Sequence, residues 1–287
     1  MRCRPVAPVL VALLGAALSA PAAAGAGDVS PSALARSTDL RTNADAWQVV
    51  ARELGTLIAN KPFAPAETSG LLGFDVAAFG TVGFVDAGTV STEARSPWAR
   101  LNADAEANPT QFLPGVAVRK GLPLSLEVGA NAAWLGRSDQ TVLGGYGRFA
   151  PVEGYREWPD IAVQVGYSAY LGNDELDLGT LDASGSLGYT FPFGRRAGIN
   201  EGAFSLWGGA GLLRINAQPR LDARTLDTLG IGPVSGLSGK PGFQEGFSPA
   251  TLHLGFRVRS GGFYTQGLVS TAPRSITTLN MGVGASF

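Results

Sequence analysis

The clearest indication of the fold is the segment Leu279-Asn280-Met281-Gly282-Val283-Gly284-Ala285-Ser286-Phe287. Every second residue from Leu279 to Phe287 is apolar, and the residues between them are small or polar. Successive side chains of a β-strand point to opposite faces, so this strand has one apolar face and one polar face. Such a strand either packs its apolar face on the core of a soluble protein, with its polar face in water, or turns its apolar face to lipid and its polar face to the interior of a barrel.

The same alternation recurs along the chain. It is clearest over 72–84, 124–134, 161–171, 181–191 and 250–258, and weaker candidates lie at 111–120, 142–152, 203–215, 263–270 and 276–287. Together these segments predict ten strands, several of them longer than the five or six residues usual in soluble proteins, which favours strands that cross a membrane. An even number suits a barrel whose two chain ends lie on the same side. A further hairpin hidden in the Gly-rich stretch 216–249 would give twelve strands, and this alternative stays open.

Composition excludes several other classes of protein. Charged residues make up 16% of the chain, well below the roughly 25% of soluble domains. After the N-terminal region, no run approaches the 18 apolar residues that a transmembrane helix needs. The 22 basic and 23 acidic residues nearly cancel, so no basic field for nucleic acid is expected.

The N-terminus has the pattern of a secretory signal peptide. Two arginines precede an apolar run over 6–18, and the alanine-rich stretch 22–26 offers cleavage sites. An uncleaved membrane anchor is the alternative, but Pro21 and the alanines favour cleavage. We therefore expect residues 1–26 to be removed. Cys3 is the only cysteine and would leave with the peptide, so disulfides and thiolate metal sites are not expected.

With this signal peptide, the alternating strands and the final Phe287, the sequence resembles the bacterial outer-membrane β-barrel proteins. The resemblance is porin-like in general pattern and identifies no specific transport family. It implies an all-β fold, a transmembrane antiparallel up-and-down barrel over 71–287, in the outer membrane of a Gram-negative bacterium. It also implies two partners, the outer-membrane lipid and the barrel insertion machinery, which reads the final strand. The residues expected to carry that insertion signal are Leu279, Met281, Val283, Ala285 and Phe287.

The resemblance makes Phe287 a test of assembly. Deleting Phe287 should lower the amount of heat-modifiable, membrane-inserted protein, because the insertion machinery reads the aromatic end of the final strand. Secretion across the inner membrane should stay intact. The measurement is the gel mobility of unheated and heated outer-membrane fractions, and wild-type amounts of folded barrel after the deletion would count against the assignment.

Loop lengths predict how the barrel is oriented. The two longest connections, 86–110 and 216–249, are both odd-numbered, whereas the tight turns at 121–123 and 260–262 are even-numbered. Outer-membrane barrels keep long loops outside and short turns in the periplasm. The two long connections are therefore expected on the cell exterior.

One segment has the period of a helix instead of a strand. Between residues 45 and 60, an apolar stripe recurs at a spacing of three and four residues, with Asn43 or Asp45 as a cap and Lys61-Pro62 as the end. The stripe consists of Trp47, Val50, Ala51, Leu54, Leu57 and Ile58. We expect this amphipathic helix in a periplasmic N-terminal segment, 27–70, where it either plugs the lumen or lies against the periplasmic rim or at the membrane surface. The rim is preferred, because an apolar stripe suits a rim better than a charged lumen.

The polar faces of the strands predict the lining of the lumen. A charge that faces the bilayer midplane costs about 2–4 kcal/mol, so charged strand residues should point inward. The candidates are Asp75, Arg119, Glu127, Arg148, Asp182, His253, Arg257 and Arg259. Both signs occur, so these side chains either pair across a closed interior or line a narrow polar path that slightly favours anions.

Catalytic, cofactor and metal sites are not expected. His253 is the only histidine, and its surroundings, Leu252-His253-Leu254-Gly255, lack the serine at plus two of the outer-membrane phospholipase motif. The sequence thus favours a narrow channel or transport protein for small solutes over an enzyme. The alternative is a structural or surface-recognition barrel with a closed lumen, acting through its exterior loops 86–110 and 216–249.

Overall fold

The computed structural model describes residues 28–36, 39–85, 96–102, 108–136, 138, 140–155, 158–196, 199–235, 250–273 and 275–287. The predicted signal peptide, 1–26, and much of the two long connections lie outside these residues. Side chains are described for all of these ranges except 195–196 and 199–201.

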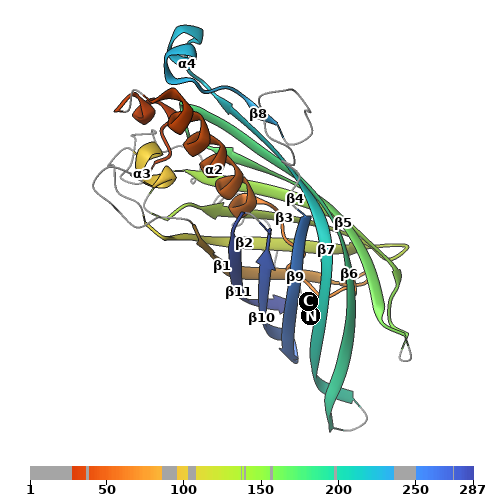
Figure 1. The fold of residues 1–287 in the computed structure, drawn as a ribbon. Coiled ribbons are helices and arrows are strands. Elements are labelled where there is room, and N and C mark those ends of the chain that lie inside the picture. Colours follow the sequence, from red (N-terminus) through yellow and green to blue (C-terminus); the bar gives the residue numbers. More distant parts are fainter. Residues whose placement is uncertain are drawn as a thin grey trace, which may run out of the picture.

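Ten antiparallel strands form one closed ring, and the predicted ten-strand barrel is confirmed (Figure 1). In chain order they are β1 (Phe74–Phe84), β2 (Thr110–Leu122), β3 (Leu126–Trp134), β4 (Thr141–Val152), β5 (Asp160–Leu171), β6 (Leu176–Arg196), β7 (Ile199–Pro219), β9 (Ala250–Ser260), β10 (Phe263–Thr271) and β11 (Thr277–Ser286). Pairing of β11 with β1 closes the ring, from Asp75 opposite Ser286 to Phe84 opposite Thr277. The two-residue β8 (Val234–Ser235) pairs only with β7 and adds no hairpin to the ring. The twelve-strand alternative was wrong.

The barrel has two distinct ends. The turn end carries the connections 123–125, 153–159, 197–198 and 261–262 and the residue Phe287, whereas the loop end carries the longer connections 85–109 and 220–249. Two predicted turns differ from those observed. Strands β6 and β7 extend to Arg196 and from Ile199, so the expected connection 192–202 shrinks to two residues. The turn expected at 121–123 moves to 123–125, because Leu124 and Ser125 adopt φ of 62° and 56°, which ends the strand pairing there.

The outside of the ring is apolar. Every strand exposes large hydrophobic side chains on its outer face, including Phe84, Val116, Val128, Phe149, Val165, Leu187, Leu206, Leu254, Val269 and Met281. A water-soluble barrel would cover such a belt with polar side chains. The belt is therefore the surface that faces lipid, as expected for a transmembrane barrel.

In the described residues, one long helix and three short helical elements accompany the strands. They are η1 (Pro31–Arg36), α2 (Leu40–Ile58), α3 (Pro97–Leu101) and α4 (Ala223–Leu229). Helix α2 starts earlier than predicted, because the Asp39 carboxylate caps it by accepting from the backbone N–H groups of Arg41 and Thr42. The same Thr42 contacts lower the pKa of Asp39. No helix in the described ranges is both long and apolar enough to span a membrane.

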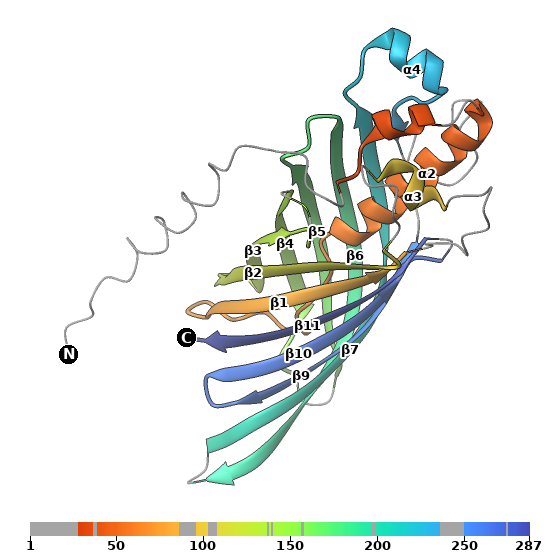
Figure 2. The ribbon, with the colours of Figure 1, turned by 90° about the vertical axis from the view of Figure 1, so that its left-hand side faces the viewer.

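Helix α2 enters the barrel from the loop end. It contacts β5, β6 and β7 of the barrel wall and the helices α3 and α4. Figure 2 shows these helices at the end opposite the C-terminus. The sequence placed the helix in a periplasmic segment and the long loops outside, but the structure puts both at one end. One of those two expectations therefore fails, because a helix that lies among the long connections cannot be periplasmic while those connections are on the cell exterior.

Candidate functional site

Helix α2 is a plug rather than a surface helix. The apolar stripe is almost completely buried, with Val50 and Leu54 each 0% exposed. From Glu53 to Ile58 every residue is buried, so this part of the helix is enclosed on all sides. Gly55 allows the closest approach to the wall, because a Cβ there would lie 2.6 Å from the Ile215 side chain of β7. The second half of α2 therefore sits within the lumen.

The loop-end half of the lumen is apolar, which the sequence did not reveal. Its wall is made by Leu113, Leu135, Val142, Tyr170, Leu176, Leu178, Leu213 and Ile215, all buried in one core with the helix. Burying each large side chain of the stripe there is worth roughly 1.5–3 kcal/mol. The preference for a rim helix was wrong, because it assumed that the whole interior is as polar as the predicted charged positions.

Hydrogen bonds fix the plug and the loop-end segments to each other. Trp98 Nε1 of α3 donates to Glu53 Oε2 over 2.6 Å, and Trp47 Nε1 donates to the Gly232 carbonyl over 2.8 Å. The Glu175 carboxylate accepts from Ser30 Oγ and from the Ser32 amide, at 2.7 and 2.9 Å. We call the assembly of η1, the first half of α2, α3 and α4 the cap. The cap is thus part of the folded core of the loop end.

The linker after the helix runs through the lumen to the turn end, where β1 starts. Asn60 Nδ2 donates to the Gly145 and Tyr167 carbonyls over 3.0 and 2.9 Å. Farther along, the Pro62 carbonyl accepts from Trp207 Nε1 over 3.0 Å, and the Pro65 carbonyl accepts from Arg148 Nη1 over 2.9 Å. Polar wall residues therefore hold the linker by its backbone and by one amide side chain.

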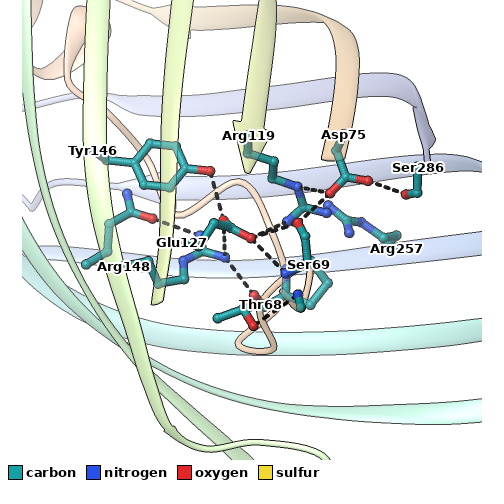
Figure 3. Close-up of polar contacts among 12 residues, drawn as sticks. Thr68, Ser69, Asp75, Arg119, Glu127, Tyr146, Arg148, Arg257 and Ser286 are labelled. Atoms are coloured by element: carbon teal, nitrogen blue, oxygen red, sulfur yellow. Dashed lines mark hydrogen bonds and ion pairs between the residues drawn. The ribbon is translucent and has the colours of Figure 1, made fainter. Parts of the chain in front are cut away.

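Four of the predicted lumen residues form one buried network (Figure 3). Arg119 Nε lies 2.5 Å from Asp75 Oδ2, and Arg119 Nη1 lies 3.6 Å from Glu127 Oε2. Arg148 Nη1 lies 3.5 Å from the other Glu127 oxygen. The linker joins the network through Ser69, whose Oγ donates to Glu127 at 2.9 Å and whose backbone N–H donates to the same oxygen at 3.0 Å. These four charges thus pair across the interior. Of the two arrangements that the sequence left open, a paired interior and a charged polar path, the network matches the first.

The other predicted lumen residues lie outside this network. Arg257 is buried and donates from Nε to Gln266 Oε1 over 2.9 Å, with its guanidinium carbon 4.3 Å from the centre of the Tyr264 ring. Asp182 is buried on β6, and neither of its oxygens has a hydrogen-bond partner in the described part of the chain. Arg259 is exposed at the turn end. The alternation therefore predicted correctly which side chains point into the lumen, but it did not predict which of them form ion pairs.

His253 has a partner that sequence reasoning missed. Its Nε2 lies 2.9 Å from Ser186 Oγ, across β6 and β9, and both residues are buried. Among the described atoms, His253 Nδ1 has no hydrogen-bond partner, so the pair lacks the carboxylate that orients a catalytic imidazole. Only the register that sets Gly209 opposite His253 and Ser186 shows this proximity, and no local motif encodes it.

Surface labelling on intact cells tests the orientation. A thiol reagent that does not enter cells should label Thr228→Cys on α4 but not Ser260→Cys beside the turn 261–262, in a chain whose Cys3 is replaced by Ser. Both positions are exposed, and Ser260 avoids the left-handed φ of 58° at Gly261. Tags inserted near Asp104 or Gly236 should behave like Thr228, although these positions lie outside the described residues. Labelling of Ser260→Cys on intact cells would show that the turn end faces the cell exterior, which would contradict the predicted orientation.

Comparison with other proteins gives structural similarity only. No protein-family model matches the sequence, and no curated protein matches it. The transport unit of the autotransporter AIDA-I from Escherichia coli is similar at 10% identity and a TM-score of 0.39, over 84% of this chain and 98% of that one. The translocator domain of the autotransporter NalP from Neisseria meningitidis reaches 10% and 0.38, over 88% and 97%. The KdgM porin reaches 7% and 0.32, over 74% and 99%. By its own closed ring, apolar belt and charged interior, the chain is a transmembrane β-barrel of the outer-membrane type.

Proposed function

We propose that the protein is an outer-membrane β-barrel with a closed lumen, and that it acts through the surface of its loop end. The observation that carries the proposal is the complete burial of α2 from Glu53 to Ile58 inside the barrel. A permanently open channel needs a continuous aqueous path, and here an apolar helix occupies the loop-end half. The cavity beside the end of α2 measures about 90 Å³, which is room for a few water molecules.

The cap supports a role in recognition. An isolated bridge joins Val29 to Asn102, and Asn173 Nδ2 donates to the Val29 carbonyl over 2.8 Å. These contacts hold two connections against the N-terminal segment, and the Trp47–Gly232 hydrogen bond holds a third. One fixed arrangement is a property of a binding surface that is preorganised for a partner. In this proposal the cap faces the cell exterior, the belt contacts outer-membrane lipid, and the turn end faces the periplasm.

We also propose that the protein is not an enzyme. Ser186 and His253 are enclosed in the wall of the lumen, and the imidazole has no carboxylate to orient it among the described residues. The pair is better explained as a hydrogen bond that satisfies two buried polar groups.

Planar-bilayer recording of the purified wild-type protein tests the closed lumen. We expect no current at moderate voltage, because ions have no path past Leu54 and Ile215. A heat-modifiable gel shift of the same sample shows that the barrel is folded. Stable stepwise currents from folded wild-type protein would contradict the closed lumen.

A channel that opens when the plug moves is the second candidate. Two open cavities at the turn end, of about 370 and 770 Å³, favour it, because the lumen is already accessible from that side. A disulfide between Gly55→Cys and Ile215→Cys would lock α2 to β7. If wild-type protein conducts and the oxidised pair does not, with current restored by reductant, the gated channel replaces the closed barrel.

A further inference from the structure

The turn-end vestibule, the cavity of about 370 Å³ between the linker and the ends of β9 and β11, is rich in arginine. Arg119, Arg257 and Arg259 line it, together with Asp75 and Glu67. The Asp75 carboxylate is already engaged by Arg119 at 2.5 Å. Arg257 and Arg259 therefore face the vestibule with the Glu67 side chain and the main-chain carboxylate of Phe287 as the further opposite charges.

Arg257 and Arg259 form no direct ion pair in the described part of the chain, and neither does Glu67. The contacts of Arg257 are the Gln266 oxygen and the Tyr264 ring, and its guanidinium lies beside that of Arg119 (Figure 3). Like charges held close together in a buried site cost free energy unless an anion compensates them.

We propose that the vestibule binds a small free oxyanion, such as phosphate, sulfate or a carboxylate, between Arg257 and Arg259. Guanidinium groups match the geometry of such anions, because their planar N–H donors form paired hydrogen bonds with two oxygens. Gln266 and Tyr264 hold the Arg257 side chain in place, so little conformational freedom is lost on binding.

The linker couples this site to the plug. Glu67 belongs to the linker and lies within electrostatic reach of all three arginines, so its carboxylate stands in for part of the ligand charge. Its neighbours Thr68 and Ser69 also line the vestibule. A bound oxyanion competes with Glu67 for Arg257 and Arg259. The site lies at the turn end and does not depend on what the cap recognises.

Calorimetric titration of the folded barrel with inorganic phosphate, at constant ionic strength set with sodium chloride, tests the proposal. Arg259→Gln should weaken binding about tenfold, the loss of one charge-assisted contact. This position is exposed, so the variant should fold. Arg257→Gln with Arg259→Gln should abolish binding, and Glu67→Gln should tighten it severalfold. Arg224→Gln on α4 removes the same charge from the loop end and should change nothing.

Four results would overturn the proposal. Equal losses in Arg259→Gln and Arg224→Gln would show attraction by net charge alone. Weaker binding in Glu67→Gln would show that Glu67 belongs to the ligand site rather than competing with it. Displacement of phosphate by phosphatidylglycerol added to the micelles would identify a lipid headgroup as the ligand instead of a free anion. Wild-type protein that binds no phosphate would refute the site directly.

Discussion

Replacing Leu54 and Leu57 of α2 by Asp should convert a silent barrel into one that conducts small ions. Both side chains are buried against the apolar wall, at 0% and 1% exposure. Losing each leucine costs about 2–5 kcal/mol of packing, and an unpaired carboxylate in that surrounding adds a desolvation penalty. The second half of α2 should therefore leave the lumen, and water should replace it. Planar-bilayer recording measures the result.

The matched control introduces the same charges on the less buried half of the helix. Ala44→Asp with Gln48→Asp places two carboxylates where the side chains remain partly exposed. This variant should stay silent. The conductance of the double leucine variant should be small, because the linker still crosses the turn-end half, held by Arg148 and Trp207. A folded leucine variant that carries no current would show that the helix does not block the path.

Replacing Glu127 by Gln should strongly destabilise the barrel. Glu127 accepts from Ser69 and Tyr146 and lies 3.6 and 3.5 Å from two arginines, all within the lumen. Removing its charge leaves Arg148 without a carboxylate partner and Arg119 with only Asp75. Breaking a buried pair in this way typically costs about 3–5 kcal/mol. The free energy of unfolding in urea, followed by tryptophan fluorescence, measures the loss.

Asp177→Asn is the control for an exposed ion pair. Asp177 lies 3.2 Å from Arg220, and both side chains are more than half exposed. Water screens this pair, so its loss should cost at most about 1 kcal/mol. Equal losses in the two variants would mean that the Glu127 network contributes no more than a surface pair.

The barrel was predictable from sequence because alternation reports the facing of each residue directly. Strand β5 shows this well, with outward Val163 and Val165 alternating with inward Gln164 and buried Ser168. The facing of Glu127, Arg148 and Arg257 followed from the same rule. Strand ends were less predictable, because the turn at Leu124 depends on backbone angles that no residue type there favours.

The plug was only half predictable. The stripe of Trp47, Leu54 and Leu57 showed that a helix must bury one face. It did not show against which part of the barrel that face packs. Its binding surface comes from inward side chains such as Leu213 and Ile215, which sit in a strand segment where both faces carry apolar residues. Their common facing toward the lumen follows from closure of the ring. The pairing of His253 with Ser186 likewise depends on the register between distant strands.

The most direct measurement of the plug is disulfide formation between Gly55→Cys and Ile215→Cys in isolated outer membranes. A Cβ at residue 55 would lie 2.6 and 2.8 Å from the two γ carbons of Ile215, which suits a disulfide. The control pairs Ile215→Cys with Leu254→Cys, which lies on the outer belt at 60% exposure, so that no side chain is added at Gly55. We expect rapid cross-linking of the first pair and none of the second. First-pair thiols that stay reduced and both react with maleimide, in a folded barrel, would contradict a helix inside the lumen.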